Sequence, residues 1–408
     1  MTAELPGSTR IVIIGAGVIG TGLAWSLART GCADVVVLEQ GQPGCGTSWH
    51  SAGNIIRMNT DPGTVQIFSE SQRVITELSQ RHDLGWRQCG RIMLARNNKR
   101  LREFDRIQDT LARLGVDCEI IEKVSISEKL PILNTDDIAG AIWSPGDGRV
   151  DPAALVSAFA SEAVDAGVSI IDGVRVIQAL QDGSRITGVL TDQGEIDCEV
   201  VVNCAGMWAR ELGLRNGVDI PLYAVEHFYL LTETIAGVQP NMPTFRDPDG
   251  LIYGREEVGG LLLGCFDRDA IPVRLADLPQ PFEFGLLNEN WDQFGPYLEQ
   301  GIHRIPALAN AGIRSLVNGP ESFTLDAEPH MDRAPGLSNY FVLAGLSSTG
   351  VTRSGGMTAA MARWILDGDP AIDVQPFSLR RFASEHNDET YLRKHIRKVP
   401  AGHFQLEA

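Results

Sequence analysis

Hydrophobic and polar positions near the N-terminus predict a strand, a turn, a helix and a second strand. Residues 10–14 are a β-branched run that begins with Arg10, and the glycine-rich residues 15–20 follow as a turn. Residues 18–30 repeat apolar positions with helical spacing up to Gly31, and residues 35–38 are again apolar. This order is typical of a β-α-β unit with parallel strands.

Elements further along the chain fall into an alternating part and a strand-rich part that begins after Ile220. Asp151 and Pro152 open a helix that ends at Gly167, because a capping carboxylate followed by proline suits the first turn. The pattern also predicts helices over residues 62–82, 99–114, 282–300 and 354–366, and strands over residues 91–95, 168–171, 174–180, 186–191, 199–203, 222–232, 251–255, 261–266 and 340–344.

Length and charge narrow the class of protein. A chain of 408 residues suits two domains. The net charge of −17 argues against nucleic acid and anionic membranes as partners, since both need basic patches.

The cysteines give no sign of a disulfide framework or a metal site. There are seven of them, an odd number, and no two form a C-x-x-C pair, so we expect neither kind of site. Glycines interrupt the apolar stretch 11–28, and we expect no targeting or membrane segment and a cytoplasmic location.

The turn after the first strand carries a dinucleotide-binding motif. Gly15, Gly17 and Gly20 form G-x-G-x-x-G between the predicted strand and helix. The helix N-terminus would face phosphates with free N–H groups and a favourable dipole. Glu39 ends the second strand, where an acid accepts ribose hydroxyls. The alternative is a glycine-rich turn without a ligand, but strand, helix and acid together favour a nucleotide.

The next segment favours FAD over NAD. Residues 45–54 read C-G-T-S-W-H-S-A-G-N, a run of small residues that suits backbone lying against a large cofactor. A nicotinamide enzyme has no evident need for such a run.

From this point the sequence resembles the FAD domain of the dimethylglycine and sarcosine dehydrogenase group, within the D-amino acid oxidase superfamily. The resemblance covers nearly the whole chain and rests on G-T-S-W-H-S-A-G at 46–53, S-P-G-D-G-R-V-D-P at 144–152, V-N-C-A-G-M-W-A-R-E-L-G at 202–213, V-E-H-F-Y at 225–229, L-V-N-G-P-E at 316–321, F-V-L-A-G at 341–345 and R-W-I-L-D-G-D-P at 363–370.

The resemblance implies an α/β fold in which a Rossmann-like FAD-binding domain is interleaved with a mixed-sheet α+β substrate domain. We expect the FAD domain over residues 1–90, 140–215 and 330–370, the substrate domain over 91–139 and 216–329, and a C-terminal arm over 371–408. Family members often continue into a folate-binding region, whereas this sequence stops at Ala408. Either folate chemistry is absent, or a separate subunit supplies it.

Candidate FAD-binding residues come from the motif, the small-residue segment and the resembling segments. In the family, a histidine at the position of His50 bonds covalently to the flavin; the alternative is a histidine that only borders the ring. The loop over residues 345–352 can aim N–H groups at the flavin edge. The predicted FAD contacts are Gly15, Gly17, Gly20, Glu39, Ser48, His50, Ala52, Gly53, Val176, Ala205, Gly206, Trp208, Gly345, Thr349, Gly350 and Val351.

Four residues are candidates for the chemistry. The resemblance implies that His227 and Tyr253 border the substrate side of the flavin, with His227 taking the proton of a substrate ammonium and Tyr253 positioning the amine. Without the resemblance, both would be ordinary sheet residues. Arg57 lies in an I-I-R segment like that of sarcosine oxidases and could hold a carboxylate, with Arg255 as the alternative.

The expected function is FAD-dependent oxidation of a small secondary or tertiary amine such as an N-methylated amino acid. Hydride would pass to flavin N5, and water would split the iminium to release formaldehyde. The electron acceptor would be oxygen or an electron-transfer protein. The alternatives are oxidation at the α-carbon of a free or cyclic amino acid, and a flavoprotein subunit that is active only within a complex.

Overall fold

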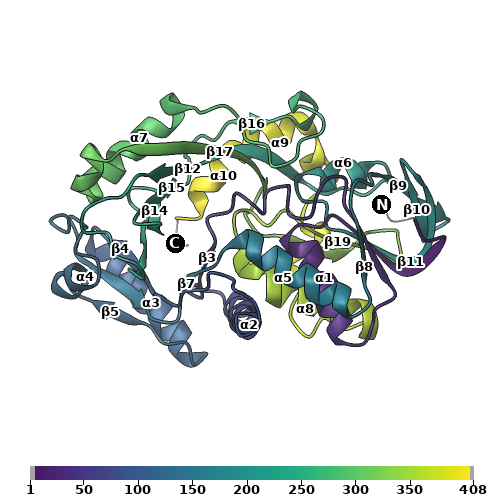
Figure 1. Ribbon diagram of the computed structural model, residues 1–408, viewed down its shortest axis with the longest axis horizontal. Helices are drawn as coiled ribbons and strands as arrows, with labels where there is room; N and C mark the ends of the chain where they lie inside the picture. The colour runs from purple at the N-terminus through teal and green to yellow at the C-terminus, as the bar shows by residue number, and fades with distance from the viewer. Residues whose placement is uncertain (1–4, 405–408) are drawn as a thin grey trace.

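The computed structural model describes residues 5–404 and has two lobes, each built around one large sheet (Figure 1). The first four residues of the expected FAD domain and the last four of the expected C-terminal arm lie outside this range. The first sheet has eight strands, and its centre is parallel. Its central order is β18 (His330–Arg333), β19 (Tyr340–Ala344), β11 (Gly194–Asn203), β1 (Ser8–Ile14), β2 (Val35–Leu38) and β8 (Ser169–Ile171).

Both faces of this first sheet are covered, which explains why its central strands are apolar on both sides. Helices α1 (Val18–Arg29), α5 (Pro152–Asp165) and α8 (Gly350–Asp367) pack together over one face, and α2 (Pro62–Leu78) packs on α8. A second core lies over the other face, formed with β9 (Val176–Asp182), β10 (Arg185–Thr191) and α6 (Ala209–Leu214). As expected, Asp151 caps α5 by accepting hydrogen bonds from the next two free N–H groups.

The second sheet has nine strands and forms the other lobe. Its long strands are β12 (Leu222–Thr232) and β17 (Ile313–Thr324), which pair antiparallel along their length. The remaining strands are β4 (Arg91–Ala95), β5 (Glu119–Ile121), β6 (Gly140–Ser144), β13 (Thr244–Asp247), β14 (Ile252–Glu257), β15 (Gly260–Cys265) and β16 (Pro272–Val273). Helices α3 (Asn98–Arg113), α4 (Lys123–Lys129) and α7 (Trp291–Arg304) flank it, and α9 (Glu389–His395) and α10 (Val399–Gly402) follow near the C-terminus.

Several elements differ from the sequence-based expectation. Strand β6 pairs with β4 and β5 of the second sheet, although residues 140–144 were expected in the FAD domain. Helix α7 begins at Trp291 and not near residue 282, because Phe284 has a left-handed backbone and Asn290 caps the helix. Helix α8 begins at Gly350, four residues before the expected start, because Arg353 already donates to the carbonyl of Thr349.

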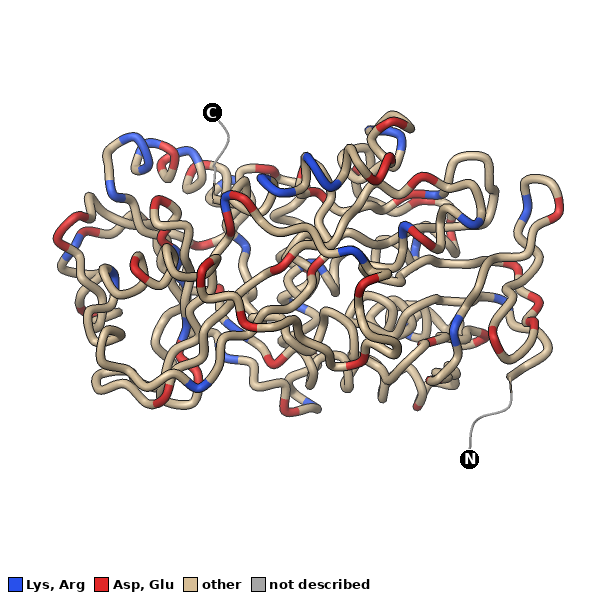
Figure 2. Tube along the Cα trace, turned by 90° about the horizontal axis from the view of Figure 1, so that it is seen from above, with Lys and Arg blue, Asp and Glu red and all other residues tan. Residues whose placement is uncertain are grey.

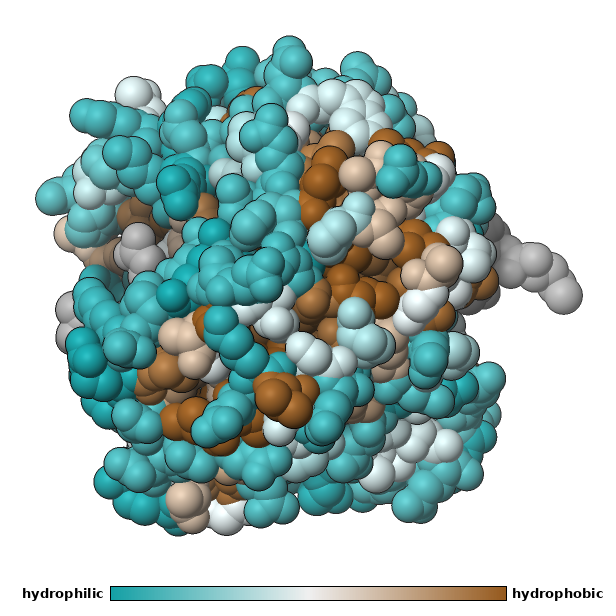
Figure 3. Space-filling model, turned by 90° about the vertical axis from the view of Figure 1, so that its left-hand side faces the viewer, coloured by the Kyte–Doolittle hydropathy of each residue, from teal (hydrophilic) through white to brown (hydrophobic). Residues whose placement is uncertain are grey.

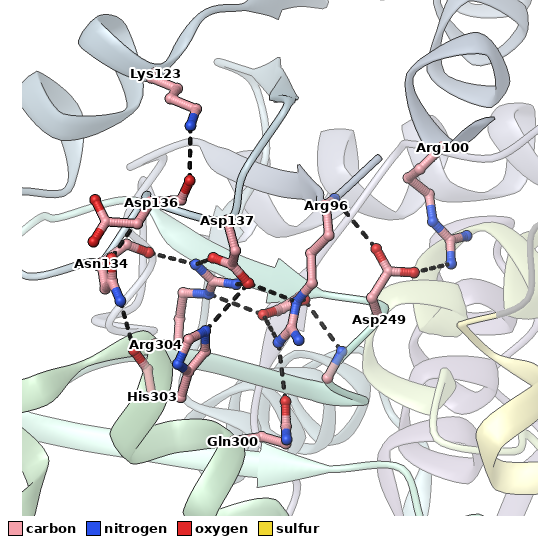
Figure 4. Close-up of polar contacts among 12 residues, drawn as sticks. Arg96, Arg100, Lys123, Asn134, Asp136, Asp137, Asp249, Gln300, His303 and Arg304 are labelled. Atoms are coloured by element: carbon pink, nitrogen blue, oxygen red, sulfur yellow. Dashed lines mark hydrogen bonds and ion pairs between the residues drawn. The ribbon is translucent and has the colours of Figure 1, made fainter. Parts of the chain in front are cut away.

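A buried ion-pair network fixes the end of β13 (Figure 4). Arg304, which is fully buried, donates to Asp247 at 2.9 Å and to both oxygens of Asp137 at 2.8 and 3.0 Å. Arg96 binds the same Asp247 carboxylate at 2.7 Å and also Gln300 at 3.0 Å. The network ties β13 to α7 and to the segment before β6, so it holds β13 rigidly in the second sheet.

Acidic and basic residues are distributed along the length of the molecule (Figure 2). The end formed by the second lobe is mainly hydrophilic with apolar groups between the polar ones (Figure 3). Exposed apolar residues include Val124, Val258 and Trp291. Within residues 5–404, no helix has the length and apolar character needed to cross a bilayer.

Candidate active site

The glycine turn between β1 and α1 leaves no room for side chains. Gly15 has a φ of +102°, and a Cβ there would lie 2.6 Å from the carbonyl oxygen of Cys204. A Cβ on Gly20 would overlap the carbonyl oxygen of Gly15, so Gly20 serves helix packing. Gly17 precedes the first residue of α1 and has no side chain to cap the helix, but Oγ of Ser48 accepts a hydrogen bond from the N–H of Val18 at 3.0 Å. The N-terminus of α1 lines a cavity, so its dipole faces a ligand there.

Glu39 connects the end of β2 to this turn. Its carboxylate accepts hydrogen bonds from the N–H of Ala16 at 2.8 Å and from the N–H of Gly41 at 3.0 Å. Burial raises the pKa of Glu39, and these N–H donors oppose that rise. The residue has the position and acceptor capacity that ribose hydroxyls require.

A large cavity, which we call the cofactor cavity, begins at the glycine turn and extends along the carboxyl ends of the first sheet. Its lining contains most of the predicted cofactor contacts: Gly15, Gly17, Glu39, Ser48, Val176, Ala205, Gly206, Trp208, Gly345, Gly350 and Val351. It also contains Gln40, Arg175 and Arg215, which sequence reasoning missed because they belong to no motif. Among the predicted contacts, His50, Ala52, Gly53 and Thr349 line a second, smaller pocket instead.

This second pocket, which we call the inner pocket, lies against one face of the nine-stranded sheet. Paired residues share a face, so the register can be followed from strand to strand: Thr244 pairs with Arg91, Arg246 with Tyr253, Tyr253 with Gly264, Gly264 with Tyr229 and His227 with Gly319. Side chains alternate between the two faces along each strand, so every second residue points from the same face. The large side chains that point from this face and line the inner pocket are those of Arg91, Arg246, Tyr253, Tyr229, His227 and Glu321.

Two glycines on the same face make room for large side chains. A Cβ on Gly264 would overlap the Tyr253 ring, and a Cβ on Gly319 would overlap the His50 ring. Thr47, Ser51, Glu321 and Val351 line both the inner pocket and the cofactor cavity, so the two spaces adjoin. The arrangement places a set of polar side chains beside a nucleotide cavity.

Residues 10–364 match the family described as FAD dependent oxidoreductase. The chain belongs to this family. The α/β fold agrees with that assignment: L-proline dehydrogenase from P. horikoshii superposes with a TM-score of 0.83, over 93% of this chain and 98% of that chain, at 24% identity. The predicted fold class and the predicted FAD cofactor are confirmed.

Several curated relatives align with almost the whole chain. The mouse (Mus musculus) mitochondrial pyruvate dehydrogenase phosphatase regulatory subunit is 38% identical over 97% of this chain and 45% of its own length. Mouse mitochondrial sarcosine dehydrogenase is 34% identical over 95% of this chain and 42% of its own. The formaldehyde-forming 4-methylaminobutanoate oxidase of Paenarthrobacter nicotinovorans is 33% identical over 95% and 47%. The expected relationship to the sarcosine dehydrogenase group is confirmed, and the chain spans about half the length of these relatives.

The cofactor cavity fits FAD. The glycine turn lets a pyrophosphate approach the backbone closely. Glu39 lines the cavity at the end of β2, where an acid can accept hydrogen bonds from ribose hydroxyls. Ser347 and Ser348 both have left-handed backbones, with φ of 46° and 63°, directly before α8. This strained turn brings the first residues of α8 to the cavity, because Gly350 and Val351 line it. The N-terminus of α8 thus supplies a positive dipole end at the cavity.

Three histidines line the inner pocket, and burial keeps all of them neutral. Burial lowers the pKa of His227 to about 3, with a smaller effect from His50. Burial lowers the pKa of His50 to about 4 and that of His403, beside Arg246 and His227, to about 3. Burial also raises the pKa of Tyr253 far above its usual range. His227 and Tyr253 both line the inner pocket, and the lowered pKa makes His227 a weaker proton acceptor than expected.

The two predicted carboxylate anchors lie outside the inner pocket. The side chain of Arg57 faces Asp147, with 3.6 Å between Nε and a carboxylate oxygen, and lies over Gly146. Ile56 lines the pocket, so its neighbour Arg57 points the other way. Arg255 donates to the carbonyl of Ala52 at 2.8 Å and pairs with Glu257. Arg57 and Arg255 therefore hold protein groups, and their placement does not support the expected role in substrate binding.

Two other arginines, Arg91 and Arg246, line the inner pocket. Arg246 donates to the carbonyl of His403 at 2.6 Å and lies over the Phe404 ring at 4.0 Å. Burial lowers the pKa of Arg246, and the like charge of Arg91 adds to this effect. Burial also lowers the pKa of Arg91, against the attraction of Asp147. The inner pocket thus contains two guanidinium groups near each other, and no sequence motif marked either residue.

Proposed function

We propose that this chain uses FAD to oxidise a small N-methylated amino acid, which it holds in the inner pocket. The observation that carries the proposal is the sheet face that brings Arg91 and Arg246 to one part of the pocket and Glu321 and His227 to another. A zwitterion matches that distribution, because guanidinium groups bind carboxylates and an acidic residue attracts a cationic nitrogen.

Neighbouring strands of a sheet lie ~4.8 Å apart. Arg246 on β13 and His227 on β12 are separated by β14 and β15. Long arginine side chains shorten the gap, so the pocket suits a substrate whose carboxylate and nitrogen are separated along an extended chain. The names of two relatives, a sarcosine dehydrogenase and a 4-methylaminobutanoate oxidase, give the range of chain lengths to test.

When bound, FAD accepts a hydride from the carbon next to the substrate nitrogen. The residues of the inner pocket bind and orient the substrate for this hydride transfer. Arg91 and Arg246 fix the carboxylate, the uncharged His227 and Tyr253 border the nitrogen without repelling a cation, and Phe266 closes the pocket with an apolar ring. Thr47 and Ser51 line both spaces and position the substrate against the cofactor cavity.

The test is anaerobic mixing of the FAD-loaded protein with a panel of amines. The panel contains sarcosine, N,N-dimethylglycine, 3-methylaminopropanoate, 4-methylaminobutanoate, glycine and proline. Bleaching of the flavin absorbance by N-methyl compounds, with one formaldehyde per flavin reduced, is the expected result. Bleaching by glycine or proline without formaldehyde would instead favour oxidation at the α-carbon.

A second candidate function is that of a flavoprotein subunit that acts only inside a complex. The similarity to a pyruvate dehydrogenase phosphatase regulatory subunit supports it. Steady turnover by the isolated chain with a dye acceptor would count against this candidate. Absence of flavin bleaching with every amine, together with tight FAD binding, would favour it.

A further inference from the structure

Glu321 is a buried acid without a cationic partner. It lies on β17, and its side chain is 16% exposed. The nearest ionisable group is His227, whose Nε2 lies 3.8 Å from a carboxylate oxygen. In the part of the chain that the structure describes, no arginine or lysine forms an ion pair with it. A largely buried carboxyl without a cationic partner favours its protonated form, so a cation bound in the pocket would favour its ionised form.

Glu321 lies where the inner pocket meets the cofactor cavity. It is one of four residues that line both the inner pocket and the cofactor cavity. Ser348, in the strained turn before α8, favours the ionised form of Glu321 through its hydroxyl and its backbone N–H. Ser348 thus opposes the rise in the pKa of Glu321 that burial causes.

We propose that Glu321 accepts the proton that the substrate ammonium loses before its carbon is oxidised. In this step the N–H bond breaks, an O–H bond forms on the Glu321 carboxylate, and the electron pair stays on nitrogen. That lone pair is required for cleavage of the adjacent C–H bond. The inference rests on the proposed oxidation of an amine and assigns a residue to its proton transfer.

The protonation properties of the neighbouring groups favour Glu321 over the histidines. Burial raises the pKa of Glu321 to about 7, so it is half ionised near neutral pH. An alkylammonium with a pKa of ~10 transfers its proton to such a group far more readily than to His227, whose pKa is about 3. The other ionisable groups of the inner pocket are His50, His403, Tyr229, Tyr253, Arg91 and Arg246, and those of the cofactor cavity are Glu39, Glu211, Arg175, Arg215 and Cys204.

The first experiment measures anaerobic flavin reduction between pH 5.5 and 9.5, using the N-methylated substrate identified with the wild type. The wild-type rate should rise with pH through about 7. Glu321→Gln should slow the reduction by ~10²–10⁴ at pH 7.5 and remove this rise, with unchanged FAD content. The loss should shrink at the highest pH, where free amine is abundant. Glu321→Asp, which keeps the carboxylate, should recover part of the rate.

Glu226→Gln is the matched control, because Glu226 is a half-buried acid on the paired strand β12 whose partners, Asn290 and Asn318, lie outside the inner pocket. It should keep the wild-type rate and pH profile. A wild type that reduces its flavin normally, with Glu321→Gln giving the same rate and profile, would overturn the assignment. A wild type that no amine reduces would instead contradict the proposed function itself.

A second experiment uses N,N,N-trimethylglycine, which has a fixed cationic nitrogen and no N–H. Calorimetric titration at pH 7 in two buffers of different ionisation enthalpy counts the protons released on binding. The wild type and Glu226→Gln should release a fraction of one proton, because the ligand cation shifts Glu321 to its ionised form, and Glu321→Gln should release none. Absence of binding or of proton release in the wild type counts against the proposal.

Discussion

Nε2 of His227 lies 3.8 Å from a carboxylate oxygen of Glu321, and burial moves the pKa values of the two groups in opposite directions. The pKa of His227 falls to about 3, and that of Glu321 rises to about 7. Near neutral pH the pair therefore consists of a neutral imidazole and a carboxyl that exchanges its proton. The contact is not an ion pair, and Glu321 remains available to a cationic ligand.

The raised pKa of Glu321 has a consequence for stability. The folded state keeps the proton to about pH 7, whereas the unfolded state loses it near pH 4.5, so the contribution is full below pH 4.5 and is lost as pH rises through 7. The gap corresponds to about 3 kcal/mol. Glu321→Gln should gain about that much stability relative to the wild type between pH 4.5 and pH 8, measured by urea unfolding. Glu226→Gln serves as the control. If the difference in unfolding free energy between Glu321→Gln and the wild type does not change with pH, the Glu321 carboxyl is not protonated in the folded state.

Removal of either pocket arginine should weaken binding of carboxylated substrates selectively. Arg246→Ala or Arg91→Ala deletes a charge-assisted contact worth ~1.5–3 kcal/mol, so KM for an N-methyl amino acid should rise by ~10–150-fold. KM for the corresponding uncharged amide should change much less. Arg57→Ala provides the comparison, because Arg57 faces Asp147 outside the pocket. A selective loss in Arg57→Ala and none in Arg246→Ala would return the carboxylate role to Arg57.

The network around Arg304 should dominate the stability of the second lobe. Arg304→Met leaves Asp247, which is fully buried, and Asp137 without this guanidinium partner, and should lower the free energy of unfolding by ~3–5 kcal/mol. Arg397→Met removes the exposed ion pair with Asp269 and should cost less than ~1 kcal/mol. Chemical denaturation of both variants gives the comparison. Equal losses would mean that burial does not set the strength of these pairs.

His50 is expected to hold the flavin covalently. Its ring packs on Gly319, and burial lowers its pKa to about 4, which leaves a neutral nucleophilic nitrogen at neutral pH. Acid precipitation of the wild type should leave the flavin in the pellet, and His50→Ala should release it to the supernatant. Complete release from the wild type would limit His50 to lining the inner pocket.

The nucleotide half of this protein can be predicted from the order of its residues alone. The G-x-G-x-x-G turn, the strands on either side of α1 and the acid at Glu39 all lie between Ser8 and Glu39. Their geometry depends on backbone sterics and short-range hydrogen bonds, such as the one from Ala16 to Glu39. Local rules of this kind can be read from the order of residues, and the resembling segments added Trp208 and Gly345, which line the cofactor cavity.

The set of side chains that share the inner pocket depends on the pairing of distant strands. Arg91 and Arg246 are distant in sequence and meet because β4 and β13 pair in parallel, and a shift of one residue in that register would turn either side chain to the other face. Arg57 lies in the I-I-R segment that suggested a carboxylate anchor. Its side chain, however, faces Asp147, whereas the neighbouring Ile56 lines the inner pocket. Pairing between strands that are distant in sequence is a property of the whole sheet. This pairing places Arg91, Arg246 and Glu321 in one pocket, and no local spacing rule separates them from other charged residues.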